Sequence, residues 1–239
     1  SLMLATGGHP SGRKLVEALG HQVVPPVPSL FSLALQAPEL TGCSGIAIDD
    51  VGLDLKLGSQ RFRQTGRVLI THRGLSGPAT LRLSAFAARA LHQSRYRGEL
   101  KLDWSAGLGR QGVEQRLQQW RHDQARRTLS AAKPFEHLPR RLWQAFLAMA
   151  GVEADRRWAD LPLKAERQLV ELLCAQSLSI QGRGPFGEEF VTAGGVSLGD
   201  VNLATMESRR CPGLYLAGEL LDVDAVSYTH LRAHETGYN

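Results

Sequence analysis

Two short apolar runs, each closed by glycine, lie near the two ends of the chain. Residues 2–5 lead into Gly7 through a single threonine, and residues 214–217 lead directly into Gly218. Each run predicts a β-strand, and the run at residues 214–217, which is too short for a helix, predicts a fully buried one. Glu219 follows the second run, and open α/β sheets bind ligands at the carboxyl ends of such strands. Glu219 is therefore a candidate to accept a hydrogen bond from a ligand hydroxyl, although a tight turn with a solvated carboxylate has the same pattern.

The pattern between residues 30 and 105 changes to short runs that are typical of β-strands. Polar and apolar positions alternate in several of them, and Gly58-Ser59 predicts a hairpin turn. The expected strands are residues 44–48, 53–57, 67–71 and 98–104. Pro78 suits the first turn of a helix that continues to about Leu91. Residues 177–180 return to a strand pattern, so the β-rich region is expected to close with this later segment.

The stretch from residue 107 to residue 176 predicts helices. Apolar side chains recur there at the spacing i, i+4 and i+7, as at Val113, Leu117 and Trp120. Two further amphipathic runs follow at residues 138–149 and 163–174. The region is long enough to form a helical subdomain of its own.

A short helix and a proline-rich segment separate the first strand from the β-rich region. Ser11 can cap the helix and Gly20 can end it. Three of the residues 25–28 are proline, which prevents a helix from continuing because it lacks a backbone N–H and has a fixed φ. The segment is therefore expected to cross in an extended form, and we place a domain boundary at about residue 28.

Composition is that of a folded protein and leaves the partner open. The chain has 239 residues, of which 43% are hydrophobic and 21% charged, so nothing indicates bulk disorder. Its formal net charge of +5 permits an anionic partner without requiring one. The arginines of the helical region include Arg121, Arg126, Arg127, Arg140, Arg141, Arg156 and Arg157. They come in pairs over several helices, with Glu and Asp interleaved and no stacking-aromatic motif, so a solvated helical face is favoured over a nucleic-acid surface.

The sequence predicts no metal site, disulfide or membrane span. Cys43, Cys174 and Cys211 are odd in number and lack metal or redox spacing, so we expect reduced thiols in a cytoplasmic protein. No apolar run approaches the roughly 18 residues of a membrane span, and no signal peptide is visible. His230 and His234 have helical spacing, but two histidines in a stretch of irregular character do not make a metal site.

Several longer motifs in the chain match one protein family. Residues 192–196 read Thr-Ala-Gly-Gly-Val, residues 213–219 read Gly-Leu-Tyr-Leu-Ala-Gly-Glu, and residues 71–78 read Thr-His-Arg-Gly-Leu-Ser-Gly-Pro. Residues 5–8 add Ala-Thr-Gly-Gly, and residues 20–30 follow the pattern Gly-His-x-Val-x-Pro-Pro-x-Pro-Ser-Leu. Together they resemble the bacterial NAD(P)/FAD-dependent oxidoreductases, a flavoprotein family that includes bile-acid reductases and aminoacetone oxidases. The resemblance covers nearly all of the chain, although the helical region matches only in order and length.

The resemblance implies FAD as a tightly held cofactor, with NAD(P)H as a candidate electron donor. The Thr-x-Gly-Gly-Val motif would lie near the flavin, where Gly194 and Gly195 would let the backbone approach a flat ring. The residues assigned to cofactor binding are Thr6, Gly7, Gly8, Thr192, Gly194, Gly195, Gly218, Glu219, Asp222 and Asn239. His72 is the catalytic candidate, because the ordinary histidine pKa of about 6.5 suits a general acid. Its alternative role is to orient the turn before the helix.

Both ends of the chain depart from the family pattern. No Gly-x-Gly-x-x-Gly motif stands ahead of Ala5, although the pyrophosphate of a dinucleotide needs that strand–turn–helix. Residues 225–236 break the pattern before Gly237-Tyr238-Asn239 resumes it, and we leave them out of the fold interpretation. We therefore expect an incomplete fragment that binds FAD weakly and is inactive by itself.

The expected fold is α/β: a partial, discontinuous Rossmann-type FAD-binding domain with an inserted β-rich, barrel-like domain that carries a helical subdomain. The expected bounds are residues 1–28 and 185–239 for the first, 29–105 and 177–184 for the second, and 106–176 for the third. The expected function is FAD-dependent oxidoreduction of a small organic substrate. The alternative is a non-enzymatic basic module that binds RNA or an acidic partner. Neither a membrane nor a nucleic acid is the expected partner, and the sequence fixes neither substrate nor oligomeric state.

Overall fold

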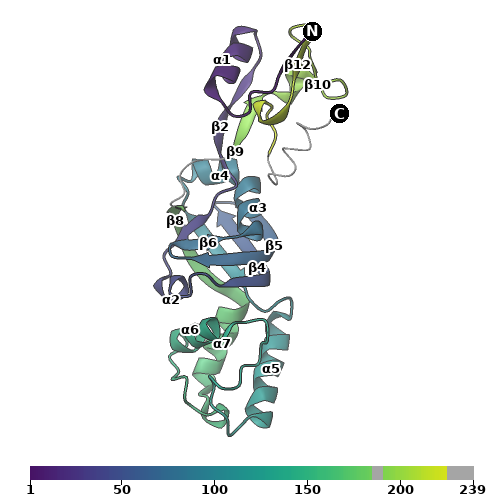
Figure 1. Ribbon diagram of the computed structural model, residues 1–239. Coiled ribbons are helices and arrows are strands. Elements are labelled where there is room, and N and C mark those ends of the chain that lie inside the picture. The colour runs from purple at the N-terminus through teal and green to yellow at the C-terminus, as the bar shows by residue number, and fades with distance from the viewer. Residues whose placement is uncertain (185–190, 225–239) are drawn as a thin grey trace. The chain divides into compact units, whose positions relative to one another are not determined.

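The computed structural model describes residues 1–184 and 191–224 (Figure 1). The chain divides into two compact units. The first unit joins Ser1–Phe31, Ser84–Gln93 and Phe186–Asn239, and the second joins Ser32–Leu83 and Ser94–Pro185. A four-stranded sheet organises the first unit, whereas a closed β-barrel organises the second.

The sheet of the first unit has the strand order β1-β12-β11-β10. β1 (Leu2–Leu4) pairs in parallel with β12 (Leu214–Leu216), as the two apolar runs predict. The remaining strands, β11 (Glu207–Ser208) and β10 (Val201–Asn202), are antiparallel to their neighbours. The two outer residues of β12 are buried, as predicted for residues 214–217, whereas β1 is an edge strand and leaves the Leu2 side chain 57% exposed.

The proline-rich segment is extended, as expected, and it is also a paired strand. β2 (Val23–Ser29) runs antiparallel to β9 (Val191–Val196), and the register shifts between Val24 and Val27. Prolines occupy this shift, and a β-bulge is one of the few positions in a ladder that tolerates a residue without an N–H.

The first helix starts earlier than Ser11 indicates. α1 covers Pro10–Ala18, and its N-cap is His9, whose Nδ1 accepts a hydrogen bond from the Ser11 N–H at 3.2 Å. Ser11 as cap is therefore wrong, because proline at the first helical position moves the start back. The predicted end is right: Gly20 has φ +86° and donates its N–H to the Glu17 carbonyl. Val16 packs into the core of the first unit with Leu4, Val196, Val201, Leu214, Leu216, Leu220 and Leu221.

Six strands of the second unit close into a barrel in the order β3-β6-β5-β4-β7-β8, which confirms the barrel-like prediction. Their bounds are β3 Leu33–Leu35, β4 Ala47–Leu57, β5 Gln60–Thr71, β6 Gly74–Ser76, β7 Gly98–Asp103 and β8 Gln176–Arg183. The hairpin turn at Gly58-Ser59 joins β4 to β5, but the strands are longer than the sequence indicates. Two expected strands merge into β4 across a register shift between Ile48 and Val51.

Short helices lie between the barrel strands in the sequence. α2 spans Pro38–Thr41, and α3 spans Pro78–Phe86 with Pro78 at its start, as predicted. The single helix expected to reach Leu91 breaks at Ala87, and α4 (Ala88–Gln93) follows it. The inward-facing residues of the barrel strands are apolar and buried: Leu53, Leu55, Val68, Ile70, Leu100, Leu102 and Ile180.

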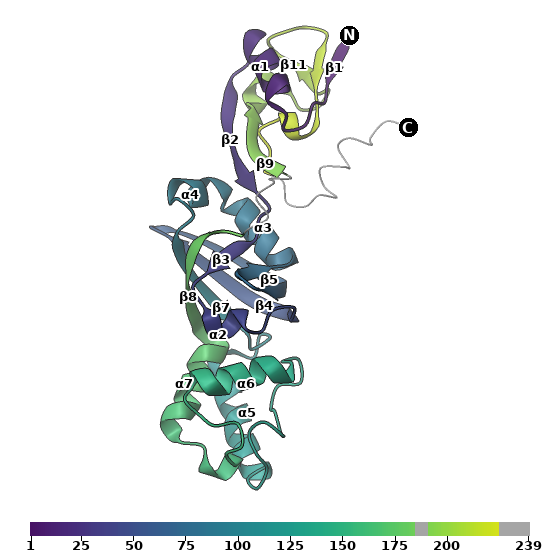
Figure 2. The same cartoon turned by 60° about the vertical axis from the view of Figure 1, so that its left-hand side comes forward.

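A helical lobe, inserted between β7 and β8, completes the second unit (Figure 2). It contains α5 (Gly109–Asp123), α6 (Arg140–Met149), the 3₁₀ helix η1 (Trp158–Asp160) and α7 (Leu163–Ala175). Trp104, directly after β7, is fully buried; its indole N–H donates to Gln176 Oε1 at 2.8 Å, and its ring meets Phe146 edge-on. This tryptophan ties the lobe to the barrel, since Gln176 opens β8 and Phe146 belongs to α6.

Candidate cofactor site

The carboxyl ends of β1 and β12 meet at one edge of the sheet. The Ala217 N–H donates to the Leu4 carbonyl at 3.1 Å, so the two strands leave the sheet together. β1 then continues into Thr6, Gly7 and Gly8, and β12 into the 3₁₀ helix η3 (Gly218–Leu220). Two of the predicted motifs, far apart in sequence, thereby become neighbours, as parallel pairing requires.

Glu219 is the centre of this edge. Its Oε1 accepts the Thr192 backbone N–H at 2.7 Å and the Thr192 hydroxyl at 3.0 Å. Hydrogen bonds to an ionised acceptor are stronger than neutral ones, so this pair fixes the carboxylate to β9. Among the described residues, both bonds end on Oε1, and Oε2 is directed toward Gly7, whose added Cβ would lie 3.9 Å from it.

Gly8 is required at its position by the close approach of Glu219. A Cβ on Gly8 would lie 2.9 Å from Glu219 Oε1 and 3.3 Å from Thr192 Oγ1. Gly12, in α1, is packed as tightly against the side chain of Thr6, because its Cβ would overlap the Thr6 hydroxyl. The small residues of the Ala-Thr-Gly-Gly segment therefore bring β1, α1 and η3 into contact.

Gly194 and Gly195 have a different role from the one the sequence indicates. Their φ angles are +118° and +145°, which favour glycine. A Cβ on Gly194 would lie 2.7 Å from the Pro25 carbonyl oxygen, and one on Gly195 would lie 2.4 Å from the Leu220 carbonyl oxygen. The protein's own backbone fills the space beside both residues. Their missing side chains allow β2 and η3 to pack on β9. No space is left on this side for the flat ring that the sequence interpretation placed there.

Asp222 is held by an arginine that the sequence does not single out. Arg89 on α4 forms an ion pair with Asp222 at 2.5 Å and a second one with Asp224 at 2.8 Å. The Asp222 N–H also donates to the Val196 carbonyl at 2.9 Å. Asp222 therefore lies close to the predicted site but is engaged in holding the chain after η3 to α4 and β9.

A second buried polar network supports the same unit. His21 Nε2 lies 2.7 Å from Ser208 Oγ, and the Gln22 N–H donates to Asp200 Oδ2 at 2.7 Å. The hydrogen bond from Gln22 and a second one from Arg210 together hold the pKa of Asp200 below its usual range. Sequence reasoning did not identify this network, because its partners are separated by up to 187 residues.

The two remaining predicted residues are not brought to Glu219 by described contacts. His72 belongs to the second unit, on the exposed turn between β5 and β6. It lines a shallow cavity of about 370 Å³ together with Arg73, Pro38 and Thr41. Asn239 lies outside the described residues.

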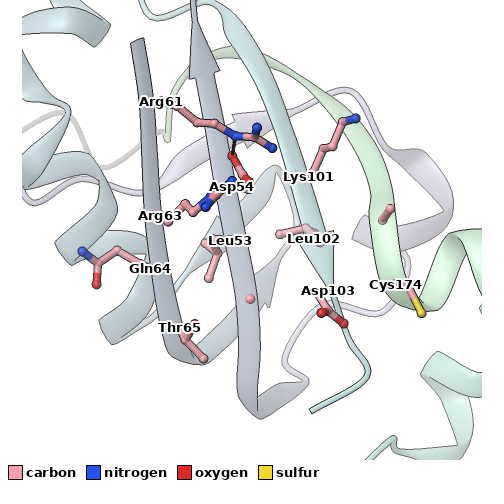
Figure 3. A pocket seen from close by; sticks show the side chains of 12 residues that line it. Leu53, Asp54, Arg61, Arg63, Gln64, Thr65, Lys101, Leu102, Asp103 and Cys174 are labelled. Atoms are coloured by element: carbon pink, nitrogen blue, oxygen red, sulfur yellow. Dashed lines mark hydrogen bonds and ion pairs between the residues drawn. The ribbon is translucent and has the colours of Figure 1, made fainter. Parts of the chain in front are cut away.

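The outer face of the barrel carries a cavity of about 340 Å³ (Figure 3). Asp54 lies between Arg61 and Arg63, at 2.5 and 2.9 Å. Burial acts to raise the pKa of Asp54, but the hydrogen bonds from the two arginines outweigh it and lower the pKa. Both arginines that line the cavity are already bound to Asp54, so we give it no ligand.

Residues 1–184 and 191–224 contain neither a cluster of metal ligands nor a membrane-spanning helix. Within these ranges no group of three or more His, Cys, Asp or Glu side chains could hold a metal ion. No helix there is long and apolar enough to cross a membrane.

The fold defines a class of protein: a closed six-stranded barrel that carries an inserted helical lobe and is joined to an α/β unit. The sequence profile of the HI0933-like protein barrel and H2TH domain matches residues 27–191, more than half of the chain. The chain belongs to this HI0933-like family. The match covers the whole barrel and all helices of the lobe.

Curated relatives include enzymes with two different names. The 3-dehydro-bile acid delta(4,6)-reductase of Clostridium scindens is 30% identical over 241 residues, which covers 97% of this chain and 57% of the relative. The ribosomal RNA dihydrouridine synthases of Escherichia coli and Haemophilus influenzae are 30% and 29% identical over 93% of this chain and 54% of each relative. The chain thus spans about half the length of the relatives it matches. Bile-acid reductases are among the members of the family that the motifs resemble, whereas an enzyme acting on RNA was not expected.

Proposed function

We propose that this chain belongs to a flavin-dependent oxidoreductase that holds FAD at the Glu219 edge of the first unit and takes electrons from NAD(P)H. The arrangement around Glu219 is the observation that carries this proposal. A carboxylate fixed by Thr192 stands at the carboxyl end of a parallel strand pair, with Gly7 beside its second oxygen. This combination suits recognition of a cofactor hydroxyl.

The fit to FAD can be assigned residue by residue at this edge. Glu219 would accept a hydrogen bond through Oε2, and Gly7 leaves the space beside that oxygen open. Thr6 and Gly8 would line the same edge, while Thr192 positions the carboxylate. The β1–α1 unit and the parallel β1–β12 pair support a Rossmann-type domain, which stays a proposal.

The reaction class follows from the names of the relatives. A delta(4,6)-reductase acts on carbon–carbon double bonds, and dihydrouridine is uridine with two hydrogens added across a ring double bond. We infer that this protein likewise reduces a carbon–carbon double bond next to a carbonyl. The bound flavin would supply the hydride, whereas the protein would bind and orient the substrate and deliver a proton. His72 stays a prediction for that proton donor.

The substrate belongs to one of two chemical classes. A small apolar organic molecule is the first, as in the bile-acid relative. A base within RNA is the second candidate, favoured by the two rRNA dihydrouridine synthases and by the net charge of +5.

An absorbance spectrum of the full-length gene product that contains this sequence tests the proposal. We expect the two visible bands of an oxidised flavin, and we expect NADH or NADPH to bleach them under anaerobic conditions. Extraction and chromatography would then identify the flavin as FAD. A colourless protein that takes up no added FAD would exclude the function, and a flavin that neither nicotinamide reduces would exclude NAD(P)H as donor.

A further inference from the structure

Two Arg-Arg pairs, thirty residues apart in sequence, lie side by side in the helical lobe. Arg126 and Arg127 follow α5, and Arg156 and Arg157 precede η1. An isolated antiparallel bridge joins Thr128 to Arg157. Further backbone bonds run from Leu129 N to Arg156 O at 2.9 Å, from Trp158 N to Arg127 O at 3.0 Å and from Ala159 N to Ala125 O at 3.1 Å. The folded chain thus gathers four arginines that the sequence shows as two separate pairs.

The backbone beneath these arginines is held by buried tryptophans. The rings of Trp143 and Trp158 stack with centroids 6.3 Å apart, and both residues are fully buried. The Trp143 indole N–H donates to the Leu129 carbonyl, and that of Trp158 donates to the Ala132 carbonyl, both at 2.8 Å. Each of the two loops is therefore anchored to the core, and the four arginines project from a supported surface.

The charges of these four arginines are not neutralised by ion pairs in the part of the chain that the structure describes. All four side chains are exposed. None of them takes part in any of the ion pairs between described residues. The Arg127 guanidinium donates to Gln124 Oε1 and to the Ala131 carbonyl, and that of Arg156 donates to the Asp160 carbonyl. These acceptors are neutral, so the positive charges remain available.

The surroundings of the surface are not free of negative charge. Glu153, Asp155 and Asp160 are exposed in the same pair of loops, yet none of them bonds to a guanidinium of the four through its carboxylate. Four exposed arginines elsewhere in the second unit differ in this respect. Arg61 and Arg63 are bound to Asp54, Arg67 to Asp49 and Arg110 to Glu171.

We propose that Arg126, Arg127, Arg156 and Arg157, here named the four-arginine surface, bind the phosphate backbone of RNA. A guanidinium presents a planar fork of donors that matches phosphate oxygens, and binding of unpaired arginines to phosphates releases counterions. The surface holds substrate RNA outside the redox site. This inference rests on the proposed function, in which a base within RNA is the second candidate substrate. Its structural evidence comes from the helical lobe alone. The interleaved acidic residues that argue for a solvated face in the sequence do not pair with these arginines in the fold.

Fluorescence anisotropy with a labelled RNA stem-loop tests the surface. The full-length protein is compared with a variant that carries R126Q, R127Q, R156Q and R157Q together. We expect the variant to bind at least about tenfold more weakly, and the slope of log affinity against log salt to fall by about 2–4 units between roughly 50 and 200 mM salt. The matched control carries R61Q, R63Q, R67Q and R110Q. It loses the same formal charge from exposed arginines that are already paired, so its affinity should stay close to that of the wild type.

The outcomes separate the surface from the proposed function. Equal losses of RNA affinity in both quadruple variants would show that net charge alone attracts RNA, and would overturn the assignment of RNA binding to the four-arginine surface. Wild-type affinity in the R126Q, R127Q, R156Q and R157Q variant would overturn it as well. Competition by polyglutamate as strong as by RNA would redirect the surface to an acidic protein and overturn the RNA assignment. A flavin spectrum without RNA binding overturns the surface only. RNA binding without flavin overturns the proposed function and leaves the surface standing. Thermal melting confirms that both variants are folded.

Discussion

Glu219 receives the backbone N–H and the hydroxyl of Thr192 on the same carboxylate oxygen, at 2.7 and 3.0 Å. The two residues belong to different elements, η3 and β9, so this double hydrogen bond joins the end of the parallel strand pair to the neighbouring two-stranded ladder. Its consequence is that one oxygen of Glu219 is used for structure while the other stays directed toward Gly7. One carboxylate can therefore fix its own position and still bind a ligand.

Replacing Glu219 with glutamine separates these two uses. The amide can keep its oxygen toward Thr192, but it presents an NH₂ donor where Oε2 accepted, and the negative charge is lost. We expect FAD affinity to fall about tenfold or more, because a hydrogen bond to a charged acceptor contributes about 1.5–3 kcal/mol. Flavin fluorescence titration measures this, with Glu17→Gln on the exposed face of α1 as the control. An unchanged affinity in Glu219→Gln would remove this carboxylate from the cofactor site.

Gly8→Ala tests the packing of the same edge. The added Cβ would lie 2.9 Å from Glu219 Oε1, so the carboxylate must move away from Thr192. We expect a loss of about 1–3 kcal/mol in the free energy of unfolding, as for other overpacked sites. In Gly199→Ala the nearest atom is Ser197 Oγ at 3.6 Å, an ordinary contact, so that variant should stay within about 1 kcal/mol of wild type. Urea denaturation followed by circular dichroism compares them, and equal losses would argue against a special role for Gly8.

The elements of the fold could be predicted where the signal is local. Glycine-bounded apolar runs identified β1 and β12, and helical periodicity identified α5, α6 and α7. Strand length could not be predicted. β4 continues through a register shift, whereas its local sequence pattern predicts two separate strands there. Helix starts were also misplaced, since a proline after His9 outweighs the capping tendency of Ser11.

The candidate site could be predicted in part. Glu219 and Gly8 were identified because each follows a strand in a recognisable motif. The partner of Asp222 could not be, since Arg89 is 133 residues away and no local pattern marks it. Gly194 and Gly195 show a more general limit: the sequence indicates that a side chain is excluded but not what occupies the space. Here the occupant is the protein's own backbone.

Asp200 should make the stability of the first unit depend on acid pH. The Gln22 N–H and then Arg210 stabilise its charged form and lower its pKa in the folded state below the unfolded value of about 3.9. This contribution is fully present above the unfolded pKa and is lost as the pH falls through the folded pKa. Asp200→Ala should therefore cost about 1–3 kcal/mol at pH near 7, and the difference from wild type should shrink at pH below about 4.

All four tryptophans lie in the second unit, so tryptophan fluorescence would not report directly on the unfolding of the first. Circular dichroism is therefore the suitable probe for this comparison. Asp155→Ala, at an exposed carboxylate of the second unit, serves as the control and should change the free energy of unfolding by no more than about 0.5 kcal/mol. A difference between wild type and Asp200→Ala that stays constant down to acid pH would contradict the assigned role of the charge.

Cys174 should be an unreactive thiol at neutral pH. Burial, and next the negative charge of Asp103, raise its pKa to about 11, against the weaker opposing effect of Arg110. Figure 3 shows Asp103 and Cys174 at the same end of the barrel cavity.

Since only the thiolate is nucleophilic, alkylation of Cys174 by iodoacetamide at pH near 8 should be at least about tenfold slower than for a cysteine in an unstructured peptide. Asp103→Asn keeps the acceptor for the Ser105 N–H but removes the charge, so it should accelerate the reaction without reaching the peptide rate, because burial persists. Peptide mass spectrometry over time gives the rates, with Asp123→Asn as the charge-matched control. Equal acceleration by both variants would contradict a local effect of Asp103.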